Sequence, residues 1–167
     1  MKKLIFLSII LISNVSFSQG LLWENNITGS NHTLLITLEE NITLDGVDID
    51  STALVGVFFE NDDGELQCGG FSNYSIDQFS IAAWGDDTTT DEIDGFQAGG
   101  DFQWYINFNG VDFAVDAIYS VFGDSNVDPS EYLTNGISNI TSLTIVVPGC
   151  TDSSALNYNQ NATVDDG

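Results

Sequence analysis

Apolar residues recur at every second position through most of the chain, from Asn31 to Val147. A period of two places successive side chains on opposite faces of a strand, so this pattern favours β-sheet over helix. Turn-forming residues separate the short alternating runs, as is typical of antiparallel strands joined by tight connections. The sequence therefore predicts that almost all of the regular structure is β.

The clearest pair of strands runs from Phe102 to Tyr119, because Asn109-Gly110 supplies the two residues that a tight hairpin turn needs. The alternation directs Trp104 toward the core and Asp112 toward the outside. Other strands are predicted at residues 33–38, 42–44, 53–59, 65–71, 78–84 and 143–147. The run at 53–59 is almost continuously apolar, which predicts a central strand covered on both faces.

These runs predict an antiparallel β-sandwich of about eight strands, of jelly-roll or immunoglobulin-like type, over residues 19–147. One helical signal interrupts the pattern. Asp128-Pro129-Ser130-Glu131 has an N-cap, an N1 proline and an N3 glutamate, so a single helical turn is expected before Asn135-Gly136.

The start of the chain predicts export. Lys2 and Lys3 are the only Lys or Arg residues, and the apolar run 4–12 and small residues at 16–18 follow them. This is the order of a secretory signal peptide, here residues 1–18. The apolar run is shorter than the ~20 residues that a membrane span needs, and no later run supplies one. We therefore expect a secreted protein, extracellular or on the outer cell surface, with no membrane span in the mature chain.

The net charge limits the classes of molecule that the protein can bind. The chain has 25 Asp and Glu and a formal net charge of -23, which becomes -25 when the two lysines leave with the signal peptide. Without Lys or Arg the mature chain cannot neutralise phosphates, so nucleic acid is not expected as a partner. Its carboxylates must be hydrated, accept backbone N–H groups or bind metal ions, and calcium is the extracellular ion that suits oxygen ligands.

One loop concentrates these carboxylates between two predicted strands. Five acids lie in the segment 85–95, which has a glycine at each end: Asp86, Asp87, Asp91, Glu92 and Asp94. Oxygen-rich loops of this kind bind calcium, although the spacing is not that of an EF-hand. The loop is thus a candidate calcium site, and a solvated acidic loop is the alternative.

A polar face with aromatic side chains is the second candidate site. Tyr105 has the phase of Gln103 and Asn107, on the outward face of the 102–108 strand, and Trp84 lies out of phase with its own strand. Aromatic platforms beside amides bind sugars, so these four residues are a candidate glycan site. This requires that their strands are neighbours and that nothing covers the face. The alternative is a Trp84 that fills the edge of the sandwich.

Catalytic motifs are scarce. His32 is the only histidine, and it has no evident partner for a catalytic triad. A zinc cluster of histidines and cysteines is excluded by number, whereas a pair of carboxylates for glycoside hydrolysis is not. We therefore expect a non-catalytic, adhesive binding or structural module that calcium stabilises. The alternative is a carbohydrate-binding module or part of a carbohydrate-active enzyme.

The two cysteines, Cys68 and Cys150, lie in segments of different character. Cys68 falls within an apolar strand pattern, where buried free thiols are common, so a bond between the two is not expected. Pro148-Gly149 ends the period of two and begins a separate segment, residues 148–167. The ending Asp165-Asp166-Gly167 is a turn, which predicts that this segment continues in a longer protein.

Several short strings resemble a known module. They are 56–59, 68–70, 83–87, 94–96, 102–104, 135–137 and 142–143. Together they resemble a β-rich module of secreted Bacteroidetes proteins. The tail, Gly149-Cys150-Thr151-Asp152 through Asn157-Tyr158 to Asp165-Asp166-Gly167, resembles a Cys-bounded repeat that follows such modules and continues with Ser-Cys. The resemblance implies an extracellular or cell-surface place and a partner for Cys150 beyond Gly167. It implies no activity.

Overall fold

The computed structural model describes residues 20–120 and 128–167, and the predicted signal peptide lies outside them. Within the described residues the fold is all-β, with nine strands and no helix. The strands are β1 (Asn31–Ile36), β2 (Thr43–Leu44), β3 (Val47–Asp48), β4 (Leu54–Glu60), β5 (Leu66–Asn73), β6 (Phe79–Trp84), β7 (Gln103–Phe108), β8 (Val111–Ser120) and β9 (Ile137–Ile145).

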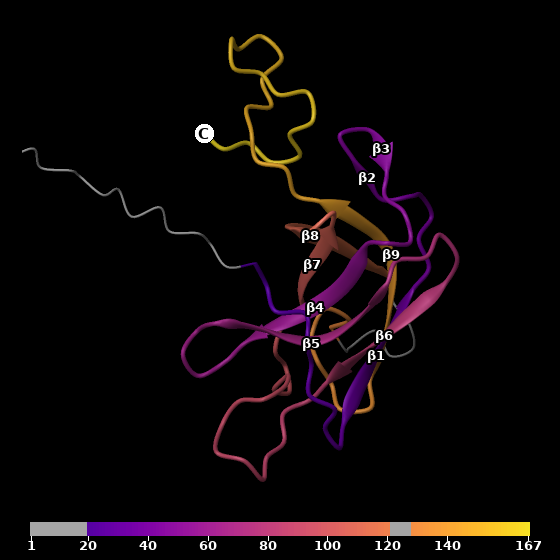
Figure 1. Cartoon of the computed structure of the whole chain (residues 1–167), viewed down its shortest axis with the longest axis vertical. Helices are drawn as coiled ribbons and strands as arrows, with labels where there is room; N and C mark the ends of the chain where they lie inside the picture. Colours follow the sequence, from indigo (N-terminus) through magenta and orange to yellow (C-terminus); the bar gives the residue numbers. More distant parts are fainter. Residues whose placement is uncertain (1–19, 121–127) are drawn as a thin grey trace, which may run out of the picture.

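Seven of these strands form one sheet in the order β5-β4-β7-β8-β9-β1-β6, and β2 and β3 form a separate two-stranded hairpin. All neighbours in the large sheet are antiparallel except β1 and β9, which are parallel. The sheet curls until its edge strands β5 and β6 lie beside each other, so its shape is close to a barrel (Figure 1). The predicted sandwich of two packed sheets is not confirmed, because one curled sheet provides both walls of the core.

Glycines allow the two edge strands to approach each other. A Cβ atom on Gly70 of β5 would overlap the carbonyl oxygen of Ala82 in β6, and one on Gly69 would overlap the ring of Phe96. Only a residue without a side chain permits this backbone approach. We call the junction between β5 and β6 the seam of the barrel.

The predicted hairpin turn at Asn109-Gly110 is confirmed, and a second turn of the same type joins β2 to β3 at Asp45-Gly46. Asn109 and Gly110 have φ values of 54° and 78°, and Asp45 and Gly46 have 52° and 75°, as type I′ turns require. Two other predictions about local structure are wrong. The segment after Asp128 is a hydrogen-bonded turn and not a helical one, and β9 begins at Ile137, six residues before the predicted start.

The core lies inside the curled sheet. Trp104, predicted to face inward, is 4% exposed, and the phenyl ring of Phe96 stacks on the buried Tyr132 with centroids 5.7 Å apart. The 148–167 segment extends away from the barrel as a series of turns (Figure 1). Hydrogen bonds from Val147 and Gly149 hold its base, with Thr163 and Val164 as acceptors.

Candidate functional site

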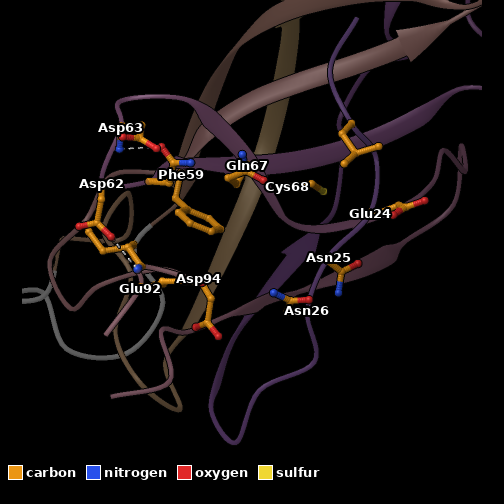
Figure 2. Close-up of a pocket in the computed structure, with 13 residues that line it drawn as sticks. Glu24, Asn25, Asn26, Phe59, Asp62, Asp63, Gln67, Cys68, Glu92 and Asp94 are labelled. Carbon is orange, nitrogen blue, oxygen red and sulfur yellow. Dashed lines mark hydrogen bonds between the residues drawn. The ribbon is translucent and has the colours of Figure 1, made fainter. Parts of the chain in front are cut away.

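An open cleft of about 620 Å³ lies beside the β4–β5 hairpin, between three segments that are distant in the sequence. One wall comes from residues 22–26, a second from the β4–β5 hairpin, and a third from residues 92–94 of the acidic loop (Figure 2). Five carboxylates line it, from Glu24, Asp62, Asp63, Glu92 and Asp94. Four carboxamides line it as well, from Asn25, Asn26, Asn61 and Gln67. We call it the acidic cleft.

Local hydrogen bonds fix the hairpin wall. The Asn61 side-chain oxygen accepts the backbone N–H groups of Asp63 at 3.0 Å and Glu65 at 2.9 Å, which closes an Asx turn. Asp62 then projects toward the acidic loop, where its carboxylate accepts the N–H of Ile93 at 3.0 Å. The hairpin and the loop therefore form one continuous surface of the cleft.

The acidic loop is closed by its own carboxylates. Asp86 accepts the N–H of Asp94 at 3.0 Å, and Asp94 accepts the N–H of Asp87 at 2.9 Å. The two end glycines meet at the neck, since a Cβ on Gly95 would overlap the Gly85 carbonyl. The Thr89 hydroxyl and N–H both donate to Asp87, and these bonds lower the pKa of its carboxyl group. Three of the five acids thus act as acceptors for backbone groups.

The five predicted calcium ligands do not converge on one point. Asp94 and Glu92 line the acidic cleft, Asp86 holds the neck of the loop, and Asp91 is exposed. The Asp87 carboxylate accepts from Thr89 within the loop. Across residues 20–120 and 128–167, no group of three or more His, Cys, Asp or Glu side chains is placed to hold a metal ion. The calcium site stays a prediction.

The predicted glycan residues are brought together only in part. Gln103, Tyr105 and Asn107 share the outer face of β7, whereas Trp84 lies half-buried on β6, which does not pair with β7. Tyr105 packs edge-on against Phe58 with ring centroids 5.2 Å apart. The Asn107 amide donates to Asp112 at 2.6 Å, and that of Gln103 donates to Glu60 at 3.2 Å.

Residues 20–30 cross this outer face, and we call them the N-terminal strap. The strap contains Trp23, whose ring packs edge-on against Phe58 and Phe71 with centroids 5.2 Å and 6.0 Å apart. No strap residue was predicted to belong to a site. The signal that indicates it is the apolar run at 53–59, because a strand that is apolar on both faces needs a cover outside the barrel.

His32 and the cysteines have structural surroundings. The Leu133 N–H donates to His32 Nδ1 at 3.1 Å, which leaves Nε2–H to donate to Ser138 Oγ at 3.0 Å. Burial lowers the pKa of His32. Cys68 and Cys150 are free thiols, and burial raises the pKa of Cys68 to about 11. Cys68 borders the acidic cleft but is 4% exposed.

No family model, curated protein or solved structure matches the chain. Within the part of the chain that the structure describes, no helix has the length and apolarity needed to cross a membrane.

Proposed function

We propose that this protein is a secreted or cell-surface module that binds or adheres without catalysis, and that the acidic cleft is its ligand site. One observation carries the proposal. The cleft is a concave surface of about 620 Å³ whose lining combines nine polar side chains with Leu22, Phe59 and Ile93. A concave site with polar groups converging above apolar ones is the general form of a small-ligand site.

The lining chemistry selects the ligand. Five carboxylates repel anions, so we expect a neutral or cationic ligand and neither nucleic acid nor an acidic polysaccharide. Carboxylates and carboxamides together accept from and donate to hydroxyl groups. This favours a neutral glycan, as in a carbohydrate-binding module, over other polar ligands. An extracellular glycan or a cell-surface component that carries one is the corresponding partner.

Calcium stabilisation is a second part of the proposal. The chain carries 25 acids and two Lys or Arg, both within the predicted signal peptide, so a divalent cation relieves repulsion wherever carboxylates gather. Carboxylate–backbone bonds hold Asp86, Asp87 and Asp94 at one neck. Rearrangement of these bonds around an ion is what the proposed calcium effect requires.

The test of the binding proposal is an array of neutral oligosaccharides probed with the exported chain. Gln67→Ala and Asn26→Ala remove polar groups from the acidic cleft, and Trp84→Ala alters the separate face of β6. We expect binding that the first two substitutions weaken about tenfold and the third leaves unchanged. Loss with Trp84→Ala alone would instead support the aromatic face, and an array without signals would leave a structural spacer.

The enzyme alternative is separable on the same ligand. A glycoside hydrolase needs two carboxylates that act across the scissile bond. If the protein were such an enzyme, incubation with the bound oligosaccharide would release new reducing ends, and Glu92→Gln or Glu24→Gln would abolish that release. We expect no release, because the proposal is a binding module.

A further inference from the structure

Two residues of the sheet are buried although they face outward. Phe58 of β4 and Cys68 of β5 are directly opposite each other in the antiparallel pair, so they lie on the same face. Neither belongs to the core cluster inside the barrel, yet Phe58 is fully buried and Cys68 is 4% exposed. A covering segment outside the barrel is required to remove both side chains from solvent.

The N-terminal strap lies over this position. The Trp23 ring packs on Phe58 and reaches to 2.9 Å from where a Cβ on Gly56 would be, so Gly56 leaves the space that the ring occupies. Leu22 and Asn25 line the acidic cleft together with Cys68. Farther along, the Thr28 hydroxyl donates to the Gly85 carbonyl at 2.6 Å, beyond the end of β6. The strap therefore crosses the outer face toward the seam.

One carboxylate anchors the beginning of the strap. Asp112 of β8 accepts the Leu21 N–H at 2.7 Å and the Trp23 Nε1–H at 2.8 Å, and it also accepts the Asn107 amide at 2.6 Å. All three partners are donors, and hydrogen bonds to a charged acceptor are stronger than neutral ones. An asparagine at this position would present an NH2 group to at least one donor, so no orientation of it would satisfy all three.

We propose that Asp112 and Trp23 are positioning residues of the acidic cleft, and that the cleft has its full wall only while they hold the strap on the sheet. Four of the side chains that line the cleft belong to the strap: Leu22, Glu24, Asn25 and Asn26. Release of the strap removes this wall and uncovers Cys68. Strap docking and ligand binding are therefore linked equilibria, so a ligand that contacts the wall stabilises the docked strap.

Cys68 reports on strap docking without any ligand. In a Cys150→Ser background it is the only thiol, and its reaction with a maleimide at pH 8 proceeds through the state in which the strap is released. We expect Asp112→Asn to increase the labelling rate by about tenfold or more, since a charge-assisted anchor is lost. Trp23→Phe keeps the ring contacts but lacks the Nε1–H donor, and we expect a smaller increase.

Asp116→Asn is the matched control, because Asp116 lies on the same strand and is exposed. Far-ultraviolet circular dichroism and the melting temperature show whether each variant keeps its fold. If Asp112→Asn does not fold, Trp23→Phe carries the test. Labelling rates equal to that of Asp116→Asn in the folded variants would overturn the proposal, because the strap would then not control access to the cleft.

A second measurement tests the link to binding, which rests on the proposed function. The probe is the neutral oligosaccharide that gives the strongest signal with the wild-type chain on the array. We expect Asp112→Asn to weaken its affinity about tenfold while the far-ultraviolet circular dichroism of the wild type is kept, and the oligosaccharide to slow Cys68 labelling in the wild type. Unchanged affinity with faster labelling would overturn the positioning role. An array without signals would refute the proposed function alone, because the labelling rates still decide whether the two residues hold the strap.

Discussion

His32 Nε2 lies 3.0 Å from Ser138 Oγ, and this contact joins β1 to β9 beneath the turn that begins at Asp128. The Ser138 hydroxyl in turn donates a hydrogen bond to the Pro129 carbonyl at 2.7 Å. Phe102 packs edge-on against the imidazole, with ring centroids 5.2 Å apart. The only histidine of the chain is thus a buried connector between two strands and a loop.

The first prediction concerns pH. Burial lowers the pKa of folded His32 below the usual 6.5, although the nearby Leu133 carbonyl opposes the shift. Between the lowered value and 6.5 the unfolded chain binds more protons, so the free energy of unfolding rises with pH there. We expect stability to fall as the pH drops below about 6.5, and the loss to level off below the folded pKa. Urea unfolding from pH 5 to 8 measures the free energy of unfolding of the wild type and of His32→Gln. The same dependence of this free energy on pH in both proteins would contradict the prediction.

The second prediction concerns Ser138, which links His32 to Pro129 by hydrogen bonds. Ser138→Ala leaves the buried His32 Nε2–H without an acceptor and the half-buried Pro129 carbonyl without its donor. Unpaired buried polar groups cost about 1–3 kcal/mol each, so we expect a loss of at least that size in the free energy of unfolding. Ser80→Ala on the exposed face of β6 is the control and should change stability by less than about 0.5 kcal/mol. A loss no larger than that of the control would show that the hydrogen bonds from His32 through Ser138 to Pro129 do not contribute to stability.

Much of the fold follows from local sequence. The alternation predicted the strands, and the Asn109-Gly110 and Asp45-Gly46 turns have the positive φ values that these residues tolerate. Period two does not distinguish two packed sheets from one curled sheet, because both bury alternate residues of every strand. That distinction depends on the seam, where Gly69 and Gly70 allow β5 to lie close to β6. The pattern of apolar residues does not predict this contact.

The candidate sites were harder to predict for the same reason. The phase of Asn107 correctly placed it on the outer face of β7, and its bond to Asp112 is local. The cover by Trp23 could not be predicted, because its bond to Asp112 joins residues 89 positions apart. Ile137 lies in β9, although its segment looks like the end of a turn, because pairing with Thr33 of β1 extends the strand. Tertiary pairing of this kind overrides local propensity.

The third prediction tests the seam. Gly70→Ala would place a methyl group on the Ala82 carbonyl oxygen, which no rotamer change can relieve because the obstacle is backbone. We expect a loss of about 3 kcal/mol or more in the free energy of unfolding, or failure to fold. Gly29→Ala is the control, since nothing lies within 4 Å of its added Cβ, and it should be neutral. Chemical denaturation of both variants provides the measurement, and a stable Gly70→Ala would mean that β5 and β6 do not meet closely.

The last prediction concerns calcium. At low ionic strength we expect millimolar calcium to raise the melting temperature by several degrees and EDTA to reverse the rise, since bound cations offset the repulsion among the acids of the 85–95 loop. Magnesium separates a defined site from general screening, because calcium accepts the irregular oxygen sets that magnesium does not. Asp91→Asn combined with Glu92→Gln should reduce the calcium effect without disturbing the neck bonds of Asp86 and Asp94. An equal rise with magnesium, or an undiminished rise in the double variant, would contradict a calcium site in this loop.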